Sequence, residues 1–208
     1  MYWLHLLLLG VGTLYLFSHC KTLAPEYEKV AFDFAGDEDV LIAKVNAEAE
    51  TGVASQYDVK GYPTIKFFKK GSTEAIAFEG DRKEAGLLKF LNKECGTYRV
   101  PGGAFEATYG LLEEFTELVK EFLTGKGLKS VIKKAVTLAT SLESTYAKYY
   151  TILMEKLFKD ASFVATEVKR LTKILKNDLS PAKRDDFNVK LNILNLFKSF
   201  TSSDEEEL

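Results

Sequence analysis

The sequence predicts an α/β segment followed by an all-α segment, and three observations carry this prediction. Before residue 96, short β-branched runs alternate with segments of helical spacing. The stretch 96–103 then combines three glycines with a proline and has no periodicity. From there to residue 200, apolar residues recur only at helical spacing, which predicts a bundle of roughly five helices.

Residues 18–95 are expected to form the α/β part, with three helices and three strands. Two of the strand-like runs flank the turn Lys70-Gly71-Ser72, which predicts a hairpin. Pro25 either stands close to the start of the first helix or marks a kink in it. The expected helices are 19–34, 50–57 and 83–92, and the expected strands are 40–45, 64–68 and 74–79.

Residues 104–200 are expected to form a helical domain, joined to the first part by a linker at 96–103. Each helix is predicted from one apolar stripe, and Ser180-Pro181 opens the last helix with an N-cap serine and a proline at the first helical position. Residues 201–208 form an acidic tail that ends in Glu-Leu. Such a tail is either a solvated end or a weak variant of the KDEL-type address.

The composition excludes several kinds of chemistry. A net charge of −2 and the lack of a basic-aromatic stripe argue against a nucleic-acid reader. The two cysteines, Cys20 and Cys95, form neither a CxxC motif nor a zinc cluster, and only two histidines remain. The sequence therefore indicates no metal site and no cofactor.

Three stretches in the α/β part occur in the order and spacing of a known family. They are His19-Cys20-Lys21-Thr22-Leu23-Ala24-Pro25-Glu26-Tyr27, Lys60-Gly61-Tyr62-Pro63-Thr64 and Phe78-Glu79-Gly80-Asp81-Arg82. On these residues the segment resembles a thioredoxin-like domain of the protein disulfide-isomerase family, without its first part. The helical segment resembles the carboxy-terminal domain of the ERp29 group, in particular over 179–183 and 192–194.

The resemblance implies roles for five positions. Cys20 matches the resolving cysteine and His19 precedes it, whereas Pro63 matches the cis-proline that faces the family's disulfide. Arg82 matches an arginine that can approach the resolving cysteine, although a plain surface charge explains it as well. Phe17 stands where the family has its attacking cysteine, and a phenylalanine cannot act as a nucleophile. Cys95 is expected to be a packed or idle thiol.

The hydrophobic segment 1–17 has three interpretations. In the first interpretation, the segment is signal-like or a membrane anchor, which would give the chain a membrane contact. Alternatively, Leu6 to Val11 replaces the strand that leads into the motif. The third and favoured hypothesis is an artefact at the gene start, because the family match resumes abruptly at Ser18 and the preceding Leu, Phe and Ser residues suit a pyrimidine-rich stretch.

These observations lead to three hypotheses about function. By lineage, the chain assists the folding of disulfide-containing secretory proteins in the lumen of the endoplasmic reticulum, but Phe17 prevents dithiol-disulfide exchange. The second is a redox-inactive escort of unfolded clients, bound by Tyr146, Tyr149 and Tyr150, residues that equally suit a bundle core. The third is a truncated product without folded function, because the missing strands would leave the edges of 40–45 and 64–68 unpaired.

Overall fold

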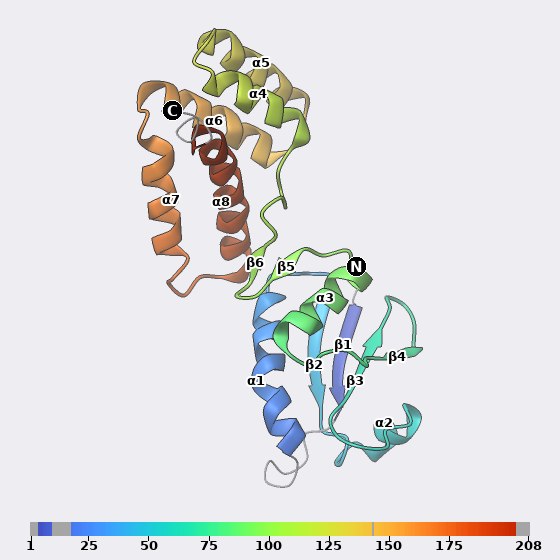
Figure 1. Ribbon diagram of the computed structural model, residues 1–208. Coiled ribbons are helices and arrows are strands. Elements are labelled where there is room, and N and C mark those ends of the chain that lie inside the picture. The colour runs from blue at the N-terminus through green and yellow to red at the C-terminus, as the bar shows by residue number, and fades with distance from the viewer. Residues whose placement is uncertain (1–3, 10–17, 143, 203–208) are drawn as a thin grey trace. The chain divides into compact units, whose positions relative to one another are not determined.

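The computed structural model describes residues 4–9, 18–142 and 144–202, and its contacts divide the chain into two units. Unit 1 is Met1–Ala104 and unit 2 is Phe105–Leu208 (Figure 1). Each unit buries its own hydrophobic cluster. The predicted fold class, a thioredoxin-like α/β part followed by a helical part, is confirmed.

The sheet of unit 1 has the strand order β2-β1-β3-β4. The central strand β1 runs parallel to β2 and antiparallel to β3, and β3 runs antiparallel to β4. The hairpin predicted between the last two strands is therefore present. The strands are β1 (Leu4–Leu9), β2 (Val40–Val45), β3 (Thr64–Phe68) and β4 (Ala75–Ala77).

The fourth strand corrects the expectation of three. Leu7 in β1 pairs with Ala43 on one side and with Lys66 on the other, so the edges of β2 and β3 that face β1 are both paired. The expectation that these two edges stay unpaired is wrong, because the leucine-rich run supplies the backbone donors and acceptors they need. A continuous apolar run suits a central strand as well as it suits a signal segment. Among the helices of the described residues, none is both long and apolar enough to span a membrane.

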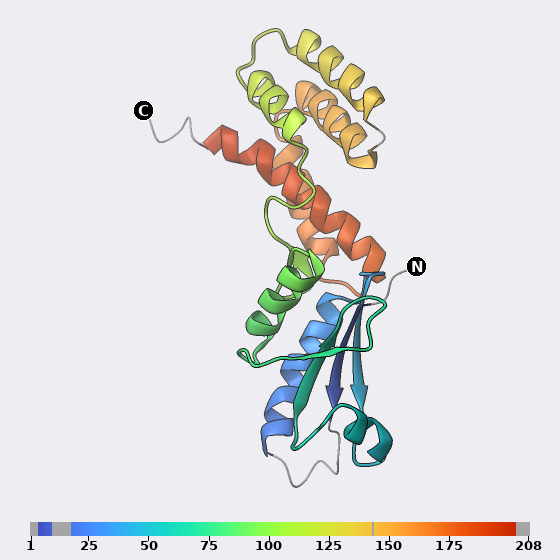
Figure 2. The ribbon, with the colours of Figure 1, turned by 90° about the vertical axis from the view of Figure 1, so that its right-hand side faces the viewer.

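Two helices of unit 1 cover one face of the sheet, and a short one lies toward the other face (Figure 2). Phe67 packs edge-on against Phe90 of α3 at 5.2 Å between ring centroids, whereas its neighbour Phe68 packs against Tyr57, just after α2, at 5.0 Å. Successive strand residues point to opposite faces, so these contacts mark the two layers. The helices are α1 (Ser18–Asp33), α2 (Thr51–Gln56) and α3 (Glu84–Cys95).

Polar side chains of α1 fix the position of α3 and β2. The Glu26 carboxylate accepts a hydrogen bond from the backbone N–H of Glu84 at 2.9 Å, which satisfies a donor that the first turn of α3 leaves open. The Tyr27 hydroxyl donates to the carbonyl of Ala43 at 2.8 Å. Pro25 lies inside α1, well past its first turn, and cannot donate a backbone hydrogen bond there.

The stretch expected to be a plain linker contains a small hairpin. β5 (Arg99–Val100) pairs with β6 (Ala104–Phe105) across a turn in which Gly102 and Gly103 have φ of 89° and 74°. The side-chain amide of Asn92 donates to the carbonyl of Arg99 at 2.8 Å and its oxygen accepts the Arg99 N–H at 2.9 Å. Sequence periodicity cannot predict this hairpin, because the hairpin is held by the Asn92 side chain of the preceding helix.

Unit 2 contains five helices within the part of the chain that the structure describes, as the apolar stripes predict. The last begins at Pro181, and the carbonyl of Ser180 accepts hydrogen bonds from the N–H groups of Lys183 and Arg184 at 3.0 Å each. The helices are α4 (Glu113–Leu123), α5 (Leu128–Ser141), α6 (Thr145–Lys159), α7 (Phe163–Ile174) and α8 (Pro181–Ser202).

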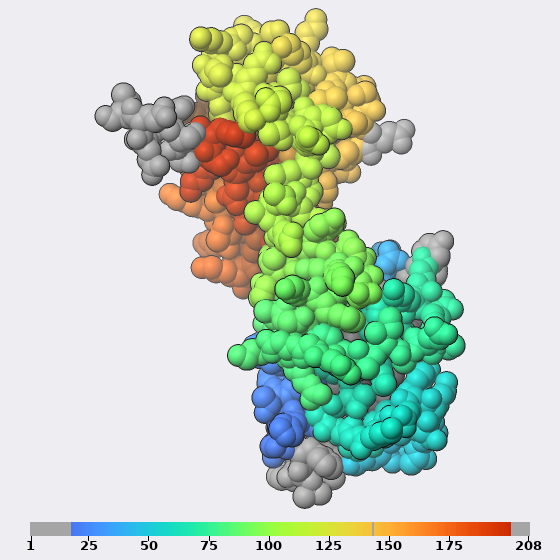
Figure 3. Space-filling view, turned by 45° about the vertical axis from the view of Figure 1, so that its right-hand side comes forward, coloured from blue at the N-terminus to red at the C-terminus, as the bar shows by residue number. Residues whose placement is uncertain are grey.

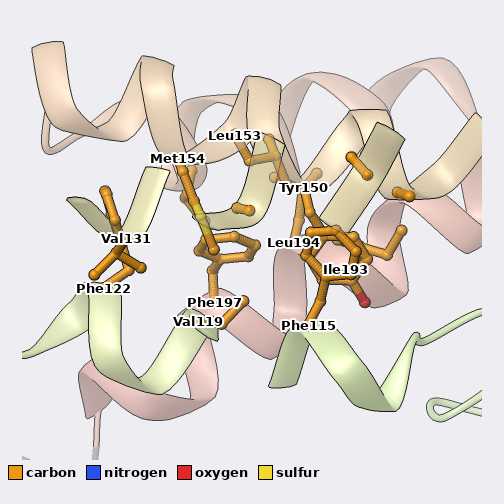
Figure 4. Close-up of a cluster of buried hydrophobic side chains, with 14 of the residues drawn as sticks. Phe115, Val119, Phe122, Val131, Tyr150, Leu153, Met154, Ile193, Leu194 and Phe197 are labelled. Carbon is orange, nitrogen blue, oxygen red and sulfur yellow. The ribbon is translucent and has the colours of Figure 1, made fainter. Parts of the chain in front are cut away.

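The core of unit 2 is built around aromatic side chains (Figure 4). Tyr150 of α6 stacks on Phe115 of α4 at 4.7 Å between centroids and lies 6.2 Å from the ring of Phe197 of α8. All three are at most 1% exposed. Gly110 leads into this core with φ of 79°, and a Cβ there would lie 2.4 Å from Val189, so the position requires glycine.

Candidate active site

A groove of about 470 Å³ lies between the start of α1, the loop before β3 and the segment before α3. Three residues that the resemblance assigns to the site, His19, Pro63 and Arg82, line it together. The first turns of α1, blue in Figure 3, lie at the surface of unit 1, and His19 is exposed there. The groove is lined by His19, Asp58, Lys60, Gly61, Tyr62, Pro63, Thr64, Lys66 and Arg82.

The loop before β3 forms the fixed wall of the groove. The peptide bond between Tyr62 and Pro63 is cis, and Pro63 is buried. The Thr64 hydroxyl donates to the carbonyl of Gly61 at 2.7 Å, which ties the two ends of this turn together. Because a proline cannot donate to a strand ladder, its place directly before β3 leaves the sheet hydrogen bonds intact.

The charged residues of the groove are mostly basic. Lys60, Lys66 and Arg82 outnumber Asp58, whose carboxylate lies 3.1 Å from the Lys60 ammonium in an exposed ion pair. Exposed pairs of this kind contribute little to stability. The charge of the groove therefore suits an acidic segment more than a basic one.

Cys20 is the third residue of α1 and is half-buried. Burial raises the pKa of its thiol; the nearby Arg82 guanidinium opposes this and Glu48 adds to it. A position in the first turn of a helix favours a thiolate, but here the cost of burying the charge outweighs that effect. Cys20 is therefore mostly a neutral thiol at neutral pH and a weak nucleophile.

Cys95 lies far from Cys20. Both cysteines are free, and burial, with the charges of Asp37 and Glu94, raises the pKa of Cys95 to about 12. Asp37 follows the carboxyl end of α1, whereas Cys20 stands at its start, and thirteen helical residues from Cys20 to Asp33 span about 20 Å at 1.5 Å each. Disulfide formation needs Cα atoms within about 7 Å, so Cys95 cannot act as the partner of Cys20.

Phe17, the position of the missing attacking cysteine, lies outside the described residues, as does the tail from residue 203. Cys20, which follows His19 on α1, lies close enough to Arg82 for their charges to interact, and within the described part of the chain no second thiol stands beside it.

The tyrosine cluster of α6 belongs to the bundle core. Tyr150 is 0% exposed and its hydroxyl accepts the N–H of Leu112 at 3.3 Å, so a client cannot reach it in the folded chain. Tyr146 and Tyr149 are half-buried against the same core. Of the two roles that the sequence left open for Tyr150, its place in the structure matches the bundle core.

The sequence motifs assign no role to the charged residues of the groove, Asp58, Lys60 and Lys66, although all three lie close to the Gly61-Tyr62-Pro63 turn and Lys60 begins one of the matched stretches. Their position on both sides of this turn is the feature of the sequence that could have indicated a charged groove. Over residues 4–9, 18–142 and 144–202, the side chains that are described form no cluster of three or more His, Cys, Asp or Glu suited to a metal ion.

Two family models match the chain, one over each unit. The thioredoxin model matches residues 17–93, and the model "Endoplasmic reticulum protein ERp29, C-terminal domain" matches residues 110–197. The first begins at Phe17, close to the abrupt start of the motif match at Ser18, and the second covers α4 to α7 and most of α8.

Curated relatives share both parts. Protein disulfide-isomerase erp38 of Neurospora crassa is 42% identical over 197 residues, which is 91% of this chain and 53% of that protein. Protein disulfide-isomerase tigA of Aspergillus niger is 42% identical over 194 residues, 92% of this chain and 53% of that protein. The chain thus spans about half the length of these relatives.

Among solved structures, the first thioredoxin domain of mouse Protein disulfide-isomerase A4 is 35% identical, with a TM-score of 0.37, covering 43% of this chain and 61% of that one. The motifs, the two family models and the relatives agree with one another. The chain belongs to the protein disulfide-isomerase family, as a thioredoxin domain joined to an ERp29-type carboxy-terminal domain.

Proposed function

We propose that this chain acts in the lumen of the endoplasmic reticulum as a family member that binds unfolded or disulfide-containing proteins in its groove without catalysing dithiol-disulfide exchange. One observation carries the proposal: the thiol beside the groove is Cys20, which directly follows the lining residue His19, and the other cysteine of the chain lies toward the far end of α1. The acidic tail ending in Glu-Leu and the relatives named as disulfide isomerases support the compartment.

The chemistry of exchange requires two thiols. A thiolate displaces one sulfur of the client disulfide, which leaves as a thiolate, and a mixed disulfide forms. A second thiolate must then attack that mixed disulfide to free the client and close an internal disulfide. Cys20 can take part in the first step only, and its raised pKa slows even that step.

Binding of clients without thiol exchange is the escort function considered in the sequence analysis. The proposal places the binding site in the groove of unit 1 and not on the tyrosines of unit 2. The turn before β3 is closed by the hydrogen bond from the Thr64 hydroxyl to the Gly61 carbonyl, and the basic residues around it attract acidic segments. Binding at such a groove needs no second thiol, which separates this function from catalysis.

An insulin-reduction assay tests the proposal. The chain is expected to give no turnover above the uncatalysed rate, and Cys20→Ser and Cys95→Ser are expected to leave the result unchanged. Activity that disappears in Cys20→Ser but persists in Cys95→Ser would refute the proposal, because it would make Cys20 a working catalyst.

The restoring variant Phe17→Cys sharpens this test. It recreates the spacing C-x-x-C with Cys20. Insulin reduction is expected to become measurable, because the variant then has both an attacking and a resolving thiol. Binding is measured separately with the S-carboxymethylated insulin B chain, which has no free thiol. Chemical shift changes confined to residues 58–66 and Arg82 are expected, and their absence would contradict binding in the groove.

A further inference from the structure

Asp33, the last residue of α1, is a buried carboxyl group that the proposed function does not use. It is 1% exposed, and neither of its carboxylate oxygens has a well-formed hydrogen bond within the described residues. A buried carboxylate without full compensation is costly, so its surroundings indicate what holds it there.

Groups from three elements surround Asp33. Glu84 of α3 and Pro101 and Gly102 of the turn between β5 and β6 line one cavity together with Asp33, which places the second carboxyl group and the turn beside it. From α1, the Lys29 ammonium lies 3.8 Å from Glu84 but only 2.7 Å from Glu26, its main partner.

An open cavity of about 710 Å³ adjoins this group. Its walls come from α1, the start of α3 and the turn, and they include Glu28, whose carboxylate pairs with Lys44 at 2.7 Å. Asp37, which follows α1, forms an ion pair with Arg99 at 3.6 Å. The cations named here each have a carboxylate partner: Lys29 pairs with Glu26, Lys44 with Glu28 and Arg99 with Asp37.

We propose that Asp33 and Glu84 share one proton and form a latch that holds the Pro101–Gly103 turn against α1 and α3 in mildly acidic solution and loosens it in neutral solution. In the closed state, the protonated Asp33 donates its O–H to the Glu84 carboxylate, while its other oxygen accepts from the glycine N–H groups. When the proton leaves, two carboxylates face each other beside one ammonium that is already engaged.

The direction of the pKa shift agrees with this arrangement. Burial and then the Glu84 charge raise the pKa of Asp33 to about 6, although the N–H groups of Gly102 and Gly103 act in the opposite sense. The folded structure therefore favours the protonated form, and ionisation favours a state in which water reaches the carboxylate. The segment that this latch controls leads directly into Phe105, where unit 2 begins.

Amide hydrogen exchange of the full chain tests the latch. After correction for the intrinsic pH dependence, the opening equilibrium of residues 101–103 is expected to rise about tenfold between pH 5 and pH 7.5, the factor for a carboxyl whose pKa is 6 closed and near 4 open. Asp33→Asn keeps a donor for Glu84 without a charge and is expected to abolish this pH dependence. The control Asp39→Asn changes an exposed carboxylate in the following loop and is expected to keep it.

Glu84→Gln provides a second, independent variant. It removes the like charge, so the pKa of Asp33, followed by NMR of its carboxyl carbon, is expected to fall below its value in the unmodified chain. Identical exchange profiles for the unmodified chain and Asp33→Asn, or an unchanged Asp33 titration in Glu84→Gln, would overturn the proposal.

Discussion

Units 1 and 2 use their interiors differently. Among the described side chains, the two buried charged residues, Asp33 and Arg99, both belong to unit 1, which also holds the groove. Of the side chains described in unit 2, the buried ones are apolar apart from tyrosine hydroxyls and the amide of Asn188, and the largest of them are almost fully buried. The comparison indicates that titratable chemistry is concentrated in unit 1, whereas unit 2 contributes packing.

The largest effect is expected from truncating the core of unit 2. Phe197→Ala removes a ring that is 1% exposed and packs near Tyr150, and should reduce the free energy of unfolding of the helices by about 3–5 kcal/mol. Urea denaturation followed by circular dichroism at 222 nm measures it. The control Phe158→Ala changes a ring that is 44% exposed and should cost much less. Equal losses for both would contradict the packing described for α8.

A smaller effect, dependent on pH, is expected in unit 1. Because the pKa of Asp33 is raised to about 6 in the folded chain, its protonation stabilises the fold below about pH 4, and this contribution is lost as the pH rises through about 6. The difference between a pKa of about 6 in the folded chain and about 4 in the unfolded chain corresponds to about 3 kcal/mol at most. Asp33→Asn should therefore be more stable than the unmodified chain at pH 7.5, with the difference shrinking toward pH 4.

Thermal unfolding of both proteins at several pH values measures that difference. Other carboxylates, such as Glu26, have a lowered pKa and change stability in the opposite direction, but they are present in both proteins and cancel in the comparison. A constant difference across pH would show that the folded chain does not favour protonated Asp33.

The sequence predicted unit 2 better than unit 1, for a physical reason. Each helix of unit 2 is predicted by apolar residues three and four positions apart, and this pattern depends only on residues close together in the sequence. The role of Leu4–Leu9 as a central strand depends on β2 and β3, which follow much later in the chain, and a run of leucines alone fits a strand, a signal segment or an anchor. The hairpin β5–β6 likewise depends on the Asn92 side chain.

The candidate site shows the same division. Motifs recovered His19, Pro63 and Arg82, and the fold brings them to one groove. The burial of Asp33 could not be predicted, because nothing within α1 distinguishes it from an exposed acidic residue and its partner Glu84 is supplied by another helix. Residue spacing identifies local chemistry, whereas a carboxyl pair across two helices becomes visible only in three dimensions.

The smallest effects should separate two neighbouring tyrosines of unit 2. The Tyr150 hydroxyl accepts the N–H of Leu112 at 3.3 Å, so Tyr150→Phe leaves a part-buried donor without its acceptor and should cost about 1 kcal/mol. The Tyr149 hydroxyl is buried without a hydrogen-bond partner in the described structure, so Tyr149→Phe should be neutral or slightly stabilising.

The same urea titration measures both variants, and each serves as the control of the other because both remove one oxygen from α6. Since unit 2 is held mainly by packing, the loss in Tyr150→Phe should remain well below that in Phe197→Ala. If Tyr149→Phe proved the more destabilising of the two, the Tyr149 hydroxyl would have a polar role in unit 2, and the contrast between a titratable unit 1 and an apolar unit 2 would weaken.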